Sequence, residues 1–212
     1  MKLFGASGSP YVRKTLAFAE EKGIEMELVA AGLGGGPPEF AQASPFRKMP
    51  AFQDGDFMIS DSTAIITYLD AIKPDPNLIP LEPKARARTI WFEEFADTIL
   101  MGAGGKIFFN RFVSPRLLGR PGDEAVAAAA EKDELPPILA YLESVIPASG
   151  WLVEDRLTLA DLAVVSPIGT LMHLGWRVDP ATYPKAAAFV DKVLGRPSYA
   201  RWIAAERVQF GT

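Results

Sequence analysis

Three short segments carry side chains whose types and spacing could support chemistry. The first is Ser7-Gly8-Ser9-Pro10-Tyr11, where a predicted strand turns into a predicted helix. Backbone N–H groups and the helix dipole converge at such a helix start, which stabilises an anion and lowers the pKa of a thiol. Ser9 could donate its hydroxyl hydrogen to a thiolate held there. Residue types alone favour the alternative, in which Ser9 caps the helix with its oxygen, ahead of Pro10 at the first helical position.

The second segment is Lys48-Met49-Pro50-Ala51-Phe52, which runs into a predicted strand. A proline at this place either starts the strand or follows a cis peptide bond. In the cis form, Met49 would turn its backbone N–H and C=O outward, and a peptide-like ligand could pair with them as an added strand. The pattern by itself favours the ordinary strand start.

The third segment is Asp61-Ser62, at the start of another predicted helix. The Asp61 carboxylate could hold an ammonium group, while Ser62 and the helix N-terminus could hold a carboxylate. The pair therefore suits a zwitterionic amino-acid head, and capping of the helix is the alternative. Together the three segments would surround one end of one small sheet.

The composition excludes several kinds of site. The chain has 212 residues, of which 49% are hydrophobic and 23% charged, as in ordinary globular proteins. It has no cysteine, which excludes disulfides, cysteine-ligated zinc and a reactive thiol of its own. The one histidine, His173, excludes a multi-histidine metal site. The net charge of −4 gives no reason to expect nucleic-acid binding.

No segment is typical of a signal peptide or a membrane span. The longest comparable stretch without Asp, Glu, Lys or Arg, Leu162 to Trp176, has 15 residues, whereas a span needs roughly 20. We interpret this stretch as a helix buried in a protein core. We expect a cytoplasmic protein with no membrane partner.

The first part of the chain alternates strand and helix patterns. A glycine-rich loop is predicted at 31–38, and the pair Asp54-Gly55 predicts a hairpin. The predicted strands cover 2–4, 26–29, 51–52 and 57–59, and the predicted helices begin at Pro10 and at 61–62. This β-α-β-α(or loop)-β-β-α order implies parallel pairing with an antiparallel edge.

Four prolines then mark a change in the chain. Proline at this density is incompatible with a helix or a central strand, and it predicts a stiff linker over 73–83. Beyond the linker the patterns are helical. They cover 84–112 and 123–146 and begin again at Thr158, Pro184 and Ser198. We therefore expect two domains, over 1–75 and 84–212.

The order and spacing of these motifs resemble the cytosolic glutathione S-transferases of the serine type (theta-, phi- or tau-like), and we expect a bacterial source. The resemblance covers nearly the whole chain. It is carried by Ser9-Pro10-Tyr11-Val12-Arg13-Lys14, by 44–52 and 61–65, and by Trp151-Leu152 and 158–162 in the second domain. It implies an α+β N-terminal thioredoxin-like domain followed by an all-α C-terminal helical-bundle domain.

The resemblance also implies a role for each motif residue. Ser9 would activate the thiol of glutathione, with Ser7 as the second candidate, because related classes differ in which serine of this turn they use. Met49, before a cis Pro50, would pair with the cysteinyl backbone of glutathione, and Asp61 and Ser62 would hold its γ-glutamyl head.

Two further assignments concern the glycyl carboxylate and the second domain. The loop at 34–38 lacks the basic or polar residues that often grip this carboxylate, and Lys48 is the alternative. Thr158 and Asp161 resemble a helix-capping box, which implies a role in folding. His173 is interpreted as a core or wall residue.

The function implied is conjugation of the glutathione thiolate to an electrophilic, largely apolar small molecule, as in detoxification. Glutathione is the expected co-substrate, with no metal, and a homodimer is implied. The electrophile pocket would lie between the domains and include Tyr11, Phe108 and Phe112. Gly102, Gly104 and Gly105 in the same predicted helix would bend it, open room for the substrate or allow close helix packing.

Two alternatives stay open. One is a glutathione-dependent isomerase, peroxidase or dehalogenase on the same fold, because a fold does not choose its reaction. The other is a non-catalytic glutathione-transferase-like interaction module.

Overall fold

The structure, a computed structural model, describes residues 1–211, apart from the side chain of Gln209. The chain forms two compact units. The first comprises residues 1–78 and 197–209, and the second comprises residues 79–196 and the residues after 209. The domain limits of 1–75 and 84–212 stay a prediction.

The first unit is built on a four-stranded mixed sheet in the order β2-β1-β3-β4. β1 pairs parallel with β2 and antiparallel with β3, and β3 and β4 form the hairpin predicted at Asp54-Gly55. The strands are β1 (Lys2–Gly5), β2 (Glu27–Ala30), β3 (Ala51–Asp54) and β4 (Phe57–Ser60). The predicted element order is confirmed, with strand ends shifted by one or two residues.

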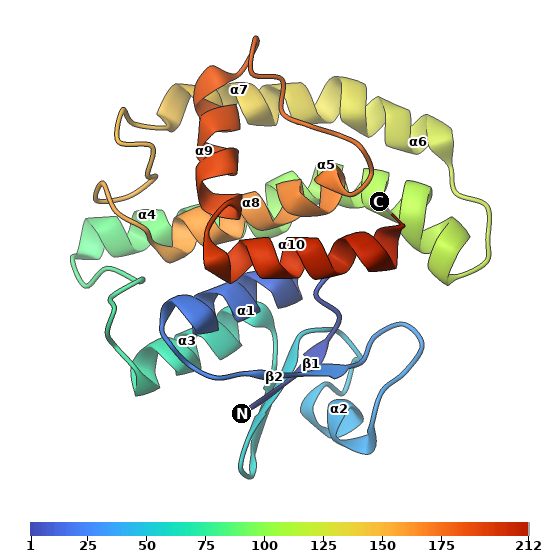
Figure 1. Cartoon of the computed structure of the whole chain (residues 1–212), viewed down its shortest axis with the longest axis vertical. Coiled ribbons are helices and arrows are strands. Elements are labelled where there is room, and N and C mark those ends of the chain that lie inside the picture. Colours follow the sequence, from blue (N-terminus) through green and yellow to red (C-terminus); the bar gives the residue numbers. More distant parts are fainter. Residues whose placement is uncertain (212) are drawn as a thin grey trace. The chain divides into compact units, whose positions relative to one another are not determined.

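Helices cover both faces of this sheet, as Figure 1 shows for the lower part of the view. Phe4 and Ala51, which are opposite each other in the register, pack against Phe40 and Ala43 of α2. Their neighbours in each strand point to the other face, where the Phe52 ring lies 5.6 Å from a ring of α3. The helices of this unit are α1 (Pro10–Glu21), α2 (Pro38–Ala43), α3 (Ser62–Ile72) and α10 (Pro197–Phe210) up to residue 209.

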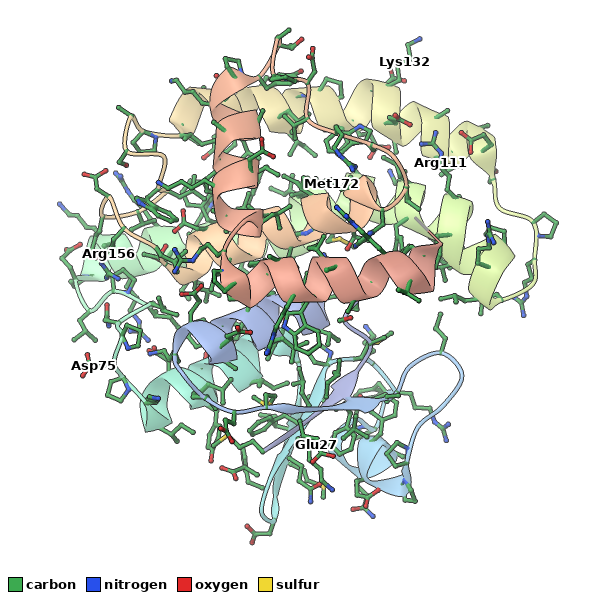
Figure 2. All side chains as sticks on the ribbon, viewed as in Figure 1. Glu27, Asp75, Arg111, Lys132, Arg156 and Met172 are labelled. Carbon is green, nitrogen blue, oxygen red and sulfur yellow. The ribbon has the colours of Figure 1, made fainter. Side chains whose placement is uncertain are left out.

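The second unit is helical. One continuous helical run contains α4 (Pro83–Glu94), η1 (Phe95–Leu100), α5 (Met101–Phe108) and η2 (Phe109–Leu117), in which the η segments are π-helical. A second run contains α6 (Glu124–Ala129), η3 (Ala130–Glu134) and α7 (Leu135–Val145), and α8 (Leu159–Met172) and α9 (Pro184–Leu194) follow. Arg111 of η2, labelled in Figure 2, forms ion pairs with Glu124 and Glu131 and so ties the two runs together.

The uncharged helix predicted as a core element is α8, and every residue from Leu159 to Leu171 is buried. Its N-terminus carries the predicted capping box. The Asp161 carboxylate accepts hydrogen bonds from the backbone N–H groups of Leu152 and Thr158, both at 2.8 Å. Burial raises the pKa of Asp161 to about 6. Because these bonds join α8 to the segment before it, the motif serves folding.

The glycines of α5 differ in their surroundings, and their role stays a prediction. A Cβ on Gly104 would lie 3.5 Å from the side chain of Leu171, an ordinary van der Waals distance, so this glycine faces α8. A Cβ on Gly102 would meet open space. Among the described residues, no helix is long and apolar enough to cross a bilayer.

A buried lysine, Lys22, lies at the C-terminal end of α1. The Lys22 ammonium has no exposed surface and forms a 2.6 Å ion pair with Asp70 of α3. It also donates to the carbonyl oxygens of Lys73, Pro74 and Pro76 at 2.7–3.0 Å. One ammonium group therefore joins the C-terminal ends of α1 and α3 to the start of the proline-rich segment.

Replacement of this ammonium should destabilise the protein strongly. Lys22→Met leaves a carboxylate and three carbonyl oxygens without their donor, which should lower the free energy of unfolding by about 3–5 kcal/mol. Lys73→Met is the control, because the Lys73 ammonium makes an exposed bond to the Gly23 carbonyl and should cost roughly 1 kcal/mol or less. Urea unfolding measures both, and equal losses would contradict a special role for Lys22.

Candidate functional site

The three segments singled out in the sequence meet at one end of the sheet in the first unit. The register places Phe4 beside Ala51 and Ala51 beside Ser60, so β1 ends, β3 begins and β4 ends at the same edge. A Cβ on Gly5 would lie 3.5 Å from the Met49 Cβ. The backbone N–H of Asp61 donates to the Pro50 carbonyl at 3.2 Å. The sheet thus brings the motifs together.

Ser9 stands at the N-cap position of α1, but its side chain makes no capping hydrogen bond. Its backbone N–H donates to the Ala6 carbonyl, and its carbonyl accepts from the Arg13 N–H, both at 2.9 Å. Pro10 follows at the helix start, as predicted. The capping role that residue types favoured is therefore wrong for the hydroxyl, which stays half-buried at the helix N-terminus. Ser7 is also half-buried in the same turn.

The start of α1 lies close against the end of β1. A Cβ on Gly5 would lie 2.5 Å from a methyl carbon of Val12, a distance that real side chains do not tolerate. Glycine at this position lets the helix approach the strand closely. The N-terminus of α1, with its inward-pointing N–H groups, is therefore held at the sheet edge.

The peptide bond between Met49 and Pro50 is cis, although the pattern alone favoured an ordinary strand start. β3 still begins one residue later, at Ala51. The hydroxyl of Ser44 bonds both to the N–H and to the carbonyl of Lys48, at 2.9 and 2.7 Å, and closes the loop before Met49. The Lys48 side chain is exposed.

The glycine-rich loop lies against Met49. A Cβ on Gly32, where φ is +156°, would lie 3.1 Å from the terminal methyl carbon of Met49 and 3.5 Å from its sulfur. The backbone groups of Gly32 and Gly35 bond to each other, which closes the loop into a tight turn. Leu33, at the tip, is exposed.

Asp61 caps α3 and keeps its carboxylate exposed. Its Oδ1 accepts the N–H groups of Thr63 at 2.9 Å and Ala64 at 3.1 Å, so it caps α3. Its backbone has φ +87° and ψ 129°, a conformation that costs a residue with a side chain about 1–3 kcal/mol. The carboxylate is nevertheless exposed, while Ser62, the first residue of α3, is buried. The edge thus presents an exposed carboxylate beside a helix N-terminus.

The residues predicted for an electrophile pocket belong to different units. Tyr11 is half-buried in the first unit, with the Lys14 ammonium 6.0 Å from its ring centroid. In the second unit the Phe108 and Phe112 rings are stacked, with centroids 5.5 Å apart. Phe210 contacts Phe112 and also stacks on His173, at 4.3 and 4.5 Å between centroids. The pocket itself stays a prediction.

One pair of residues near the edge was not foreseen. Arg13, one turn after Ser9, is completely buried, and its guanidinium donates to the carboxylate of Glu206 in α10 at 2.7–3.1 Å. No local pattern links two residues 193 positions apart. Among the described residues, no group of three or more His, Cys, Asp or Glu is placed to hold a metal ion.

Comparison with known families gives matches in both halves of the chain. Residues 3–77 match the model described as "Glutathione S-transferase, N-terminal domain". Residues 119–206 match "Glutathione S-transferase, C-terminal domain".

Individual relatives extend this similarity over nearly the full length. The chain is 31% identical over 209 residues to a glutathione S-transferase of Hyoscyamus muticus, covering 96% of this chain and 97% of that protein. Among solved structures, glutathione transferase F7 of Populus trichocarpa has a TM-score of 0.81 at 26% identity, covering 96% and 97% of the two chains. A glutathione S-transferase-I solved with lactoylglutathione has a TM-score of 0.80 at 27% identity, covering 96% and 98%.

The strained cap at Asp61 makes a prediction about stability. Asp61→Ala removes both capping bonds and keeps the unfavourable φ, so it should lower the free energy of unfolding by about 1–2 kcal/mol. Asp61→Gly also loses the bonds but relieves the strain, and the loss should be only a few tenths of a kcal/mol. Urea unfolding of the two variants measures the difference. Equal losses would mean that the observed φ carries no strain.

Proposed function

Because this chain belongs to the glutathione S-transferase family of enzymes, we propose that it joins the thiol of glutathione to an electrophilic, largely apolar small molecule. The observation that carries this proposal is the Ser9 hydroxyl, which is not used for capping and lies at the N-terminus of α1. Met49 and Asp61 stand at the same sheet edge. Ser9 is the residue proposed to activate the thiol.

The edge offers a complementary group to each part of glutathione. The exposed Asp61 carboxylate suits the ammonium of the γ-glutamyl head, and Ser62 with the α3 N-terminus suits its carboxylate. Next to the cis Pro50, the backbone of Met49 suits the cysteinyl peptide group. For the glycyl carboxylate we propose the exposed Lys48, whose backbone is held by Ser44. This arrangement would place the cysteinyl sulfur toward Ser9.

The energy needed to activate the thiol is modest. A free thiol has a pKa of roughly 8.5, and lowering it by one to two units requires about 1.4–2.7 kcal/mol of preferential thiolate stabilisation. A hydroxyl donor to a charged acceptor contributes roughly 1.5–3 kcal/mol, and the helix N-terminus adds to it. Ser9 and α1 together are therefore sufficient.

The reaction then needs only a positioned electrophile. The thiol proton passes to solvent, and the thiolate sulfur donates an electron pair to the electrophilic carbon. The leaving group departs with the electrons of its bond, or, in an addition, the acceptor carbon takes a proton. We propose Tyr11, Phe108 and Phe112 as apolar contacts for this second substrate. Holding both substrates together supplies the remaining rate enhancement.

We also propose that the enzyme works in the cytoplasm as a homodimer. Exposed aromatic side chains on both units support the dimer, since such groups are enriched where protein surfaces meet. In the first unit, Phe46 is 86% exposed, in the loop before Met49. In the second unit, Trp91 is 46% exposed, and its ring lies 5.6 Å from that of Tyr141.

Replacement of the proposed activating serine tests the reaction directly. Ser9→Ala removes one charge-assisted hydrogen bond, so kcat/KM with an aromatic halide should fall about 10- to 150-fold. Retention on immobilised glutathione should change little, because the other contacts remain. Ser7→Ala is the matched control and should retain the activity.

The outcomes separate the alternatives. Loss of activity only in Ser7→Ala would move the activating role to Ser7. Binding of glutathione by the wild type without turnover of any electrophile would favour the non-catalytic module. A panel that includes isomerase, peroxidase and dehalogenase substrates identifies the reaction by its fastest substrate.

The proposed dimer makes a separate prediction. Phe46→Asp places a charge on the exposed ring position and should shift the protein from dimer to monomer in sedimentation at micromolar concentration. Val208→Asp is the control, because Val208 is 87% exposed and lies outside this loop. A wild type that sediments as a monomer would contradict the dimer.

A further inference from the structure

The pair formed by Arg13 and Glu206 lies close to the proposed reaction centre in the fold. Both side chains are completely buried. Nε of Arg13 lies 3.0 and 3.1 Å from the two carboxylate oxygens, and Nη2 lies 2.7 Å from one of them. The N–H of Arg13 also donates to the Ser9 carbonyl and so closes the first turn of α1. The backbone of Arg13 thus stands one turn, about 6 Å along the axis, from that of the proposed activating residue.

Two other described contacts also join α1 to α10. Glu20 pairs with Arg201 at 2.8 Å, and the Ser198 hydroxyl donates to the Glu21 carboxylate. The links join residues 13, 20 and 21 of α1 to residues 206, 201 and 198 of α10. The two helices are therefore antiparallel neighbours, as Figure 1 shows for the red and blue helices. Of these three links, the Arg13–Glu206 pair is the one nearest to the start of α1.

A cation in the first turns of a helix opposes the helix dipole, which favours anions there. Burial of a charge also requires a partner. Arg13 nevertheless occupies such a position, where an anion at the α1 N-terminus would benefit from it. Glu206 supplies the compensating charge from another helix. The unfavourable placement of a buried cation near the α1 N-terminus is explained if a thiolate binds there, as in the proposed function.

Other charged side chains lie on or near α1, and several of them also form ion pairs. Lys22 pairs with Asp70, and Glu20 pairs with Arg201. The charged side chains on α1 and on the elements packed against it, besides the pair itself, are Lys14, Glu20, Glu21, Lys22, Asp61, Asp70, Arg201 and Arg207, with Arg47 and Lys48 in the loop before β3. These groups are unchanged in a comparison that alters only Arg13 and Glu206, so their effects on a thiol cancel.

We propose that Arg13 and Glu206 together set the acidity of the thiol bound at Ser9. Arg13 stabilises the thiolate through its charge, and Glu206 limits this effect by neutralising Arg13. The proposal rests on the proposed function, since the thiol is that of glutathione. Glu206 acts through Arg13 and is a positioning residue. The C-terminal helix α10 is thereby part of the machinery that tunes the nucleophile.

The sign of the effect follows from Coulomb's law. The arginine guanidinium keeps its charge in proteins, so removal of the Glu206 charge makes the net charge beside α1 more positive by one unit. A unit charge about 10 Å away, at an effective dielectric constant of about 20, shifts a pKa by about one unit. The thiol should therefore become more acidic when Glu206 is neutralised. If Glu206 had only a structural role, its neutralisation would not lower the pKa of the thiol.

The test compares thiol pKa values in the glutathione complexes, from the ultraviolet absorbance of the thiolate and from the pH dependence of kcat/KM. In Glu206→Gln the pKa should fall by about one unit. In the double variant Arg13→Met with Glu206→Gln it should return to the wild-type value, because both states are net neutral. Arg201→Gln, which breaks the half-exposed link of the same two helices, should leave the pKa unchanged. An unchanged or raised pKa in Glu206→Gln overturns the proposal.

Folding of the variants is checked by circular dichroism. The double variant should fold, because replacing a buried ion pair with less polar groups is often neutral for stability.

If Glu206→Gln does not fold, Glu206→Asp replaces it. This variant keeps the charge but moves it away from Arg13, so the thiol pKa should fall by a few tenths, and a rise overturns the proposal. A wild-type complex with a thiol pKa of about 8.5 contradicts the proposed function instead.

Discussion

The burial of α1 is the constraint on which the rest of the first unit depends. Its residues from Val12 to Ala19 are all buried, including the charged side chains of Arg13 and Lys14. Such a helix cannot tilt without exposing apolar surface or separating a buried charge from its partner, and either change costs several kcal/mol. Its N-terminus therefore stays at the sheet edge. The proposed chemistry needs this fixed placement, because the Ser9 hydroxyl is held by the backbone and not by a capping bond.

The partners that hold α1 come from distant parts of the chain. Asp70 and the carbonyl groups of the proline-rich segment surround Lys22 at one end, and Glu206 holds Arg13 at the other. The first unit consequently includes α10, which follows residues 79–196 of the second unit in the sequence. Since the same helix carries the partner of Arg13, the interaction that holds α1 is also the one proposed to tune the nucleophile.

Much of the architecture follows from local patterns. Alternation of apolar residues, the Asp54-Gly55 pair and the prolines predict the order of elements in the first unit, because each signal acts within a few residues. The uncharged stretch beginning at Leu162 predicts a buried helix for the same reason. The strand predicted at 26–29 is β2 at Glu27–Ala30, a shift of one residue. Residue types also favoured a cap at Ser9 and an ordinary strand start at Pro50, and neither describes the site.

By itself the sequence determined which residues could do chemistry. Its lack of cysteine means that a reactive thiol must arrive with a ligand, and its three motifs supply a hydroxyl, a proline at a strand start and a carboxylate. Only the tertiary structure decided how they are used. It frees the Ser9 hydroxyl, strains Asp61 so that its carboxylate both caps and remains exposed, and joins Arg13 to Glu206. These outcomes depend on contacts between elements far apart in the chain, where burial and charge pairing outweigh the preferences of any short segment.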